Sequence, residues 1–241
     1  MRLPFFLCEL VALWSVGACC STGSIHKPNQ IGTACDALSP APSRLTDPDP
    51  GHARTEAVIS ATLLPRALPG FVQSSTDELV LVMIKQDPHT TEEAVYVTRT
   101  APRPTPPEYK VVHVRSKVRL SARDEPGGAD FSEVAINAGL VQALEQSWGS
   151  LTLRARWPDR KSSISMMKFG GTTYTFEYAG DNVYGQGYTI SPEPGTCTAT
   201  LAELGDLLAQ FADQRDETKR TSIRAELLRS SQRLSDRLGG Q

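Results

Sequence analysis

Cysteine and histidine are the residues of this chain best suited to metal or redox chemistry, and their spacing matches no common motif. The cysteines are Cys8, Cys19, Cys20, Cys35 and Cys197, and the histidines are His26, His52, His89 and His113. No C-x-x-C pair occurs, and the histidines are scattered along the chain. Structural zinc sites use clustered ligands at short, regular spacings. The sequence therefore predicts no metal site and no cofactor.

The usual catalytic signatures are also missing from the sequence. It contains no G-x-S-x-G, no H-E-x-x-H, no Walker lysine loop and no dinucleotide-binding glycine fingerprint. Carboxylates occur near the ends of expected strands, at Asp77, Glu78, Asp87, Glu92 and Glu93. A catalytic pair needs a defined separation between its two carboxylates, and nothing in the sequence sets one. The sequence favours a protein without enzymatic activity.

Aromatic and glycine residues are concentrated around segment 180–187, which we interpret as a loop before a short strand, 188–190. Tyrosines here could form a flat platform that stacks on sugar rings, with neighbouring polar side chains completing the contact. The candidate ligand contacts are Tyr174, Asp181, Asn182, Tyr184 and Tyr188. The alternative is that the tyrosines follow from the β-propensity of the region and that the glycines serve turns.

The first eighteen residues differ from the rest of the chain. Arg2 supplies a positive charge, and residues 3–18 are almost wholly apolar. The run has the length of a signal-peptide core and is too short for a stable membrane span. Glu9 opposes this interpretation, because a carboxylate is costly to insert into hydrocarbon. We interpret residues 1–18 as a signal peptide, with a cytosolic chain that has a chance apolar start as the alternative.

The leader ends in Val16-Gly17-Ala18-Cys19, which resembles the lipobox of bacterial lipoproteins. The resemblance implies that Cys19 becomes the mature N-terminus and carries acyl chains such as palmitate. More than one chain gives lasting membrane attachment. The next residue is Cys20 rather than Asp, which by the same resemblance implies the outer membrane if the host has one. Secretion without a lipid is the alternative.

Segments GGTTYTFEYAG and SPEPGT resemble parts of exported Gram-negative proteins that have no assigned activity. This second resemblance covers less than a fifth of the chain and implies no role for any residue.

Three cysteines remain once the leader is removed and Cys19 is acylated: Cys20, Cys35 and Cys197. In an oxidising compartment a pair such as Cys35–Cys197 would pin the N-terminal tail to the core. One thiol would be left over, so the cysteine count alone does not decide the pairing.

Composition divides the chain into four parts: a signal peptide (1–18), a lipid-attachment and disordered spacer segment (19–56), an α+β domain (57–215) and a charged C-terminal helix (216–241). The spacer is rich in Pro, Ser, Thr and Asp, and it offers little apolar surface to offset the entropy of ordering.

The formal net charge of the chain is −2, with 25 basic and 27 acidic residues. Its overall field therefore attracts neither nucleic acid nor an anionic surface.

Hydrophobic periodicity predicts strands and helices in the domain. Strands are expected at 57–64, 78–85, 93–98 and 112–122, with a hairpin of 163–169 and 172–178. In the strand at 112–122, His113, Arg115, Lys117 and Arg119 alternate with apolar residues and form a basic, solvated face. A capping box of Asp130 and Glu133 predicts a helix to about 147, and further helices start near Thr198 and Thr221. The predicted fold class is α+β, an antiparallel sheet packed by a central helix and C-terminal helices.

These patterns predict a membrane-tethered lipoprotein of the cell envelope that is a non-enzymatic binding or structural module. Its partners would be the membrane, through the lipid, and an envelope protein or glycan, but not nucleic acid. The alternatives are a small envelope hydrolase that uses carboxylates or His113, and a cytosolic interaction domain.

Overall fold

The computed structural model describes residues 35–40, 57–59, 61–64, 77–100, 107–122, 125–155, 170–180 and 183–239. The chain divides into two compact units, Met1–Ile31 and Gly32–Gln241, and all the described residues belong to the second. The predicted signal peptide, Cys19 and the strand at 163–169 lie outside the described residues.

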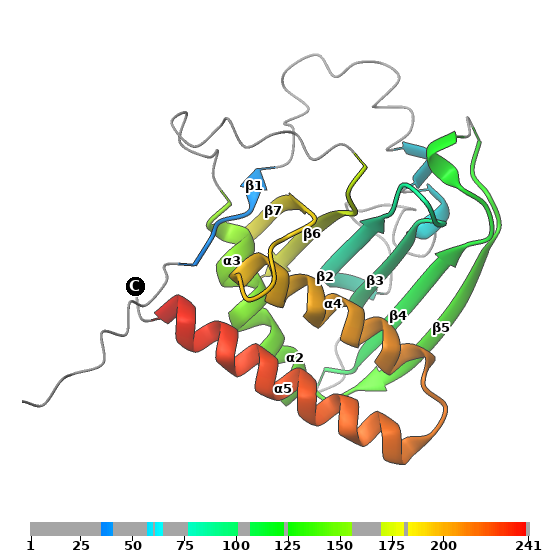
Figure 1. The fold of residues 1–241 in the computed structure, drawn as a ribbon. Helices are drawn as coiled ribbons and strands as arrows, with labels where there is room; N and C mark the ends of the chain where they lie inside the picture. Colours follow the sequence, from blue (N-terminus) through cyan, green and yellow to red (C-terminus); the bar gives the residue numbers. More distant parts are fainter. Residues whose placement is uncertain are drawn as a thin grey trace, which may run out of the picture. The chain divides into compact units, whose positions relative to one another are not determined.

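One antiparallel sheet of seven strands organises the described part of the chain (Figure 1). The strands are β1 (Ser39–Pro40), β2 (Asp77–Gln86), β3 (Glu93–Thr100), β4 (Tyr109–Ser116), β5 (Ala129–Ile136), β6 (Thr173–Gly180) and β7 (Val183–Ile190). Their order is β1-β7-β6-β2-β3-β4-β5. Strands β2 to β5 form a meander, and the chain then crosses to the other side of β2, where β6 and β7 form a hairpin.

The two long C-terminal helices, α4 and α5, lie next to each other on one face of this sheet (Figure 1). The helical elements are η1 (Leu120–Ala122), α2 (Ala138–Leu144), the π-helical turn η2 (Glu145–Gly149), α3 (Ser150–Leu153), α4 (Cys197–Asp213) and α5 (Glu217–Gly239). None of the described helices combines the length and apolar character needed to cross a bilayer.

Both faces of the central strands are buried. A large core between the sheet and the helices contains Met83, Phe176 and Trp148. A smaller core on the opposite face contains Val82, Tyr96 and residues of the segment 57–64. Successive strand residues point to opposite faces, so a strand covered on both sides needs a continuous apolar run. This explains the sequence ELVLVMIK in β2.

The predicted α+β class, with its antiparallel sheet and C-terminal helices, is confirmed. The predicted capping box is wrong, however, because Asp130 and Glu133 lie in β5, which pairs with β4 along its whole length. The helix begins at Ala138, where the Asn137 side chain accepts a hydrogen bond from the Leu140 amide at 2.7 Å. Pairing with a neighbouring strand outweighs a local helix-start signal, because propensity is only a weak prior.

Three other local expectations also fail. The strand expected at 112–122 ends at Ser116, and Leu120–Ala122 form the helical turn η1. Residues 57–59 and 61–63 are helical, not extended. Val58, Ile59, Thr62 and Leu63 are buried at the spacing of a helix that packs one face. The segment 180–187 is not a loop, since β6 runs to Gly180 and β7 begins at Val183.

The predicted boundaries of the domain are too narrow at both ends. Residues 35–40 belong to the folded unit, although they fall in the segment interpreted as a disordered spacer. The C-terminal helix is likewise part of the main core, because Leu227, Leu234 and Leu238 are buried within it. Composition alone predicts no ordered structure for residues 35–40. A few specific contacts with the core order them.

Gly205 permits the close approach of α4 to the sheet. A Cβ atom at this position would overlap Met83 of β2, reaching within 2.7 Å of its Cε. Alanine has the higher helix propensity, yet we expect Gly205→Ala to lower the free energy of unfolding by about 1–3 kcal/mol, because overpacking dominates in a buried interface. Urea denaturation measures the change.

Gly139→Ala in α2 is the matched control, since the nearest atom to its Cβ is Asn137 Oδ1 at 3.7 Å. We expect it to change stability by less than about 0.5 kcal/mol. Equal effects of the two substitutions would contradict the packing argument.

Candidate functional site

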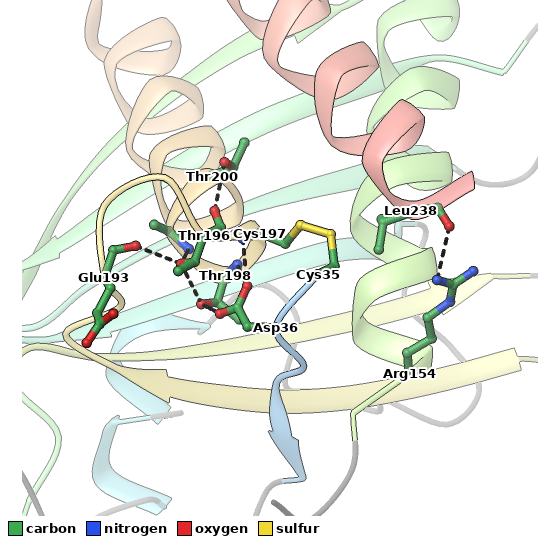
Figure 2. The surroundings of a disulfide bond; sticks show 10 residues. Cys35, Asp36, Arg154, Glu193, Thr196, Cys197, Thr198, Thr200 and Leu238 are labelled. Carbon is green, nitrogen blue, oxygen red and sulfur yellow. Dashed lines mark hydrogen bonds between the residues drawn. A yellow bond between two sulfur atoms is a disulfide. The ribbon is translucent and has the colours of Figure 1, made fainter. Parts of the chain in front are cut away.

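The N-terminal end of the described fold is fastened to the start of α4 (Figure 2). Cys35 and Cys197 form a disulfide with Cα atoms 5.3 Å apart, across a sequence separation of 162 residues. This is the pairing that the cysteine count left open. Cys197 is the first residue of α4 and is fully buried, so the covalent bond attaches residue 35 directly to the core.

Asp36 reinforces this attachment by capping α4 from a distant part of the chain. Its carboxylate accepts hydrogen bonds from the Cys197 amide at 2.6 Å and the Thr198 amide at 3.1 Å, and also from the Thr198 hydroxyl (Figure 2). Thr196, the local N-cap, accepts from the Ala199 amide at 3.1 Å. A helix N-terminus has unpaired amides and a partial positive charge, so a carboxylate there is stabilising.

A short strand completes the attachment. Ser39 and Pro40 of β1 pair with Tyr188 and Gly187 of β7. Gly187 has no side chain, and a Cβ there would reach within 2.8 Å of the Leu38 Cβ. The glycine therefore allows the N-terminal segment to lie close against the sheet. We call Cys35, Asp36 and β1 the N-terminal clasp.

The other end of α4 meets a network of charged side chains, which we call the His113 network. His113 in β4 lies between two carboxylates, with Nδ1 3.0 Å from Asp213 Oδ1 and Nε2 3.2 Å from Glu93 Oε2. Asp213 is the last residue of α4, and Glu93 is the first residue of β3. Lys85 Nζ of β2 lies 3.2 Å from Glu93 and 2.8 Å from Asp206 of α4.

Strand register and helix periodicity bring these residues together. Lys85 pairs with Glu93 across β2 and β3, and Glu93 pairs with Arg115 across β3 and β4. Side chains of directly paired residues share a face, so all three point toward the helices. Asp206 and Asp213 are two helical turns apart and therefore lie on one side of α4.

Burial and hydrogen bonding act in opposite directions on His113. Its side chain is only 3% exposed, and burial alone would lower the pKa. Hydrogen bonds to Glu93 and Asp213 outweigh that effect and raise the pKa above the usual 6.5. The hydrogen bond from His113, with the charge of Lys85, lowers the pKa of Glu93 to about 2 against burial. The two carboxylates therefore favour the protonated form of His113.

This arrangement differs from the predicted solvated basic face. His113 is buried beneath α4, while Arg115 and Lys117 are exposed. The prediction failed because α4, a hundred residues further along the chain, supplies Asp213 as a partner. With both ring nitrogens bound to carboxylates, His113 has no free nitrogen to act as a general base.

The strand-end carboxylates form no catalytic pair among the described residues. Glu92 is buried and accepts hydrogen bonds from the amides of Leu120 at 2.7 Å and Ser121 at 2.9 Å, so it orders η1. Asp87 accepts from the His89 amide at 2.7 Å and the Thr172 hydroxyl at 2.8 Å. The side chains of Asp77 and Glu78 lie outside the described residues. The described residues contain no group of three or more His, Cys, Asp or Glu side chains that could hold a metal ion.

The candidate ligand-contact residues do not gather at one place. Tyr174 lies on the helix-facing side of β6, beside the buried Phe176, with ring centroids 6.3 Å apart. Tyr184 and Tyr188 lie on the opposite face, because they pair with Ala179 and Thr175 of β6. Asp181 and Asn182 lie outside the described residues. Two of the five predicted contacts therefore share a surface.

That surface combines aromatic and polar side chains. Tyr184 is 55% exposed, and the Gln186 amide donates a hydrogen bond to Glu177 at 3.2 Å beside it. Tyr184 and Tyr188 are four residues apart, which is about 13 Å along a strand. We call Tyr184, Gln186, Tyr188 and Glu177 the tyrosine face.

Sequence reasoning missed the polar residues that fasten α4. Asp36 stands next to Cys35, so a disulfide at Cys35 would have signalled its proximity to the start of α4. Asp206 and Asp213 stand at heptad spacing in a helix whose other face is apolar. That spacing placed the two carboxylates on one side of the helix but could not identify their partners, Lys85 and His113.

The His113 network predicts a pH-dependent contribution to stability. Because folding raises the pKa of His113, this residue stabilises the fold fully below pH 6.5, and the stabilisation is lost as the pH rises through the folded-state pKa. Because folding lowers the pKa of Glu93, this residue stabilises the fold above pH 4.5, and the stabilisation is lost as the pH falls toward 2. We therefore expect His113→Gln to cost about 3 kcal/mol near pH 5.5 and less at both higher and lower pH. Urea denaturation from pH 3 to pH 9 measures the difference.

His89→Gln is the control for this series, because His89 is exposed. We expect it to change stability by less than about 0.5 kcal/mol at every pH. A cost at His113 that does not vary with pH would mean that packing rather than charge accounts for it.

Comparison with models of protein families, with curated proteins and with solved structures found no match to the chain. A function must therefore be argued from the clasp, the network and the tyrosine face themselves.

Proposed function

We propose that this protein is an exported lipoprotein, anchored by acyl chains on Cys19, whose folded unit is a non-enzymatic binding module of the cell envelope. The observation that carries the proposal is the Cys35–Cys197 disulfide. Disulfides persist in oxidising compartments and are rare in reducing cytosol. A structural disulfide is therefore expected of an exported chain, in keeping with the apolar leader.

The N-terminal clasp also suits a tethered domain. Cys35 follows Cys19 by sixteen positions in the sequence. A chain of this length spans at most about 55 Å when fully extended. A force applied through the tether would act on the fold at Cys35, and the disulfide would transmit this force to α4. A covalent attachment at this point protects the β1–β7 pairing from being peeled away.

The tyrosine face is the surface that we assign to binding. Alternating aromatic rings and polar groups suit a glycan, because sugars present both apolar ring faces and hydroxyls. Tyrosine combines a flat apolar body with a polar tip, so it contributes both kinds of contact. No catalytic role is assigned, since the only buried histidine among the described residues is held by two carboxylates.

Acylation of Cys19 is tested by labelling the expressing host with a palmitate analogue. We expect the wild-type protein to incorporate label and to lose its N-terminal residues before Cys19, and Cys19→Ser to incorporate none. Cys20→Ser is the matched control and should be labelled like the wild type. Mass spectrometry of the purified protein identifies the N-terminus and the thiol state of Cys35 and Cys197. A mature protein that still begins at Met1, without acyl mass, would exclude the lipoprotein assignment.

Binding is tested by co-sedimentation with purified peptidoglycan sacculi. We expect Tyr184→Ser to weaken binding about tenfold, since loss of one aromatic contact costs roughly 1–1.5 kcal/mol. Phe131→Ser is the control, because Phe131 is a 46% exposed aromatic at the opposite edge of the sheet. Equal loss in both variants, or no sedimentation of the wild type, would contradict the glycan assignment and direct the search to a protein partner.

A further inference from the structure

Helix α5 concentrates positive charge in a chain that is negative overall. Residues 217–239 contain six basic and three acidic side chains, a formal charge of +3. The whole chain carries −2, so the remainder carries −5. The net charge of the chain therefore conceals a positively charged helix.

Three of the six basic residues of α5 form a stripe along one flank of the helix. Arg229, Arg233 and Arg237 follow one another at intervals of four residues and therefore share one side of the helix. The side chains of Arg229 and Arg233 are each 67% exposed. Both contact Glu226, at 2.6 Å and 3.0 Å, so one carboxylate is shared between two guanidinium groups. Surface pairs of this kind are weak, and the three arginines outnumber the two acidic residues of this flank, Glu226 and Asp236.

The apolar face of α5 holds the stripe in a fixed position. Leu227, Leu234 and Leu238 are buried in the main core, and the Ser231 hydroxyl donates to the Ala143 carbonyl of α2 at 2.6 Å. The arginines are therefore attached to a rigid surface rather than to a flexible tail.

The N-terminal clasp lies at the same end of the fold as the C-terminus of α5. Figure 2 shows Cys35 near Leu238 at this end of the helix. Cys35 packs against the buried cluster that contains Leu238, and Arg154 of the turn after α3 donates to the Leu238 carbonyl at 3.2 Å. Cys35, the first described residue of the fold, thus lies next to the end of α5 that carries Arg237.

We infer that the arginine stripe of α5 rests on the anionic phospholipid headgroups of the membrane that holds the lipid anchor. This inference rests on the proposed lipoprotein function, which supplies the membrane. An anionic surface attracts α5, with its formal charge of +3, and repels the rest of the chain, which carries −5, so electrostatics orient the domain with α5 toward the bilayer. The tyrosine face, on the other side of the sheet from the helices, is then directed away from the membrane and toward a partner.

The test uses the mature protein, as purified from its host, on vesicles of phosphatidylglycerol or of phosphatidylcholine. Phenylglyoxal labels exposed arginines, and mass spectrometry reads the rate at each site. We expect Arg229 and Arg233 to react at least about fivefold more slowly on phosphatidylglycerol than on phosphatidylcholine, while Arg119 reacts equally on both. The difference should disappear in 1 M salt, where the Debye length is about 3 Å.

Two charge variants separate the stripe from total charge. Each basic residue near an anionic surface contributes about fivefold in partitioning. We therefore expect Arg229→Gln, Arg233→Gln and Arg237→Gln together to reduce the preference for phosphatidylglycerol vesicles on the order of 100-fold. The matched control, Lys110→Gln, Lys117→Gln and Arg119→Gln, removes the same charge from exposed positions around β4 and should change it less than about twofold. Thermal unfolding verifies that both variants are folded.

The outcomes distinguish the two proposals. Attachment of the mature protein to phosphatidylcholine vesicles reports the lipid anchor alone. If the mature protein does not attach to these vesicles, the proposed lipoprotein function is contradicted. Equal labelling rates on both vesicles, or equal losses in the two charge variants, would overturn the role of α5 and leave the lipid anchor untouched.

Discussion

Helix α4 is held at both ends by residues distant in sequence, and the rest of the fold depends on this placement. At its start, Cys35 and Asp36 supply a covalent bond and a carboxylate cap. At its end, Asp213 meets His113, which in turn holds Glu93. Between these points Gly205 brings the helix close to Met83. The helix that covers the sheet is thus positioned by a disulfide, by charge and by packing.

The two ends of α4 contribute different kinds of stability. A disulfide that closes a loop of 162 residues acts largely by restricting the unfolded chain. The His113 network acts in the folded state, and its contribution depends on protonation. Burial of a charged histidine would be unfavourable alone, and two carboxylates offset it. The first contribution depends on redox conditions and the second on pH, so the two can be measured separately.

The sheet separates the surfaces to which functions are assigned. Its helical side carries the clasp, the charged network and α5, and its other side carries the tyrosine face. Helix and strand periodicities produce this separation, because each residue's face follows from its register. The membrane contact proposed for α5 and the partner contact proposed for Tyr184 therefore do not compete for one surface.

Local patterns in the sequence were sufficient for much of the architecture. The apolar run in β2 and the helical spacing of Leu201, Leu204 and Leu208 predicted elements that the structure contains. Local signals failed where a neighbouring strand or helix intervened. The capping box in β5 and the β-capable segment at 57–64 both gave way to pairing or packing with distant residues.

The sequence by itself determined the α+β class, the positions of the C-terminal helices and the presence of cysteines able to pair. Only the tertiary structure decided that Cys35 joins Cys197, that His113 is buried between two carboxylates, and that Tyr174 and Tyr184 lie on opposite faces. The physical reason is distance along the chain. Hydrophobic periodicity reports which side of an element is apolar, whereas the partner of a polar side chain depends on residues about a hundred or more positions away that meet it only after folding.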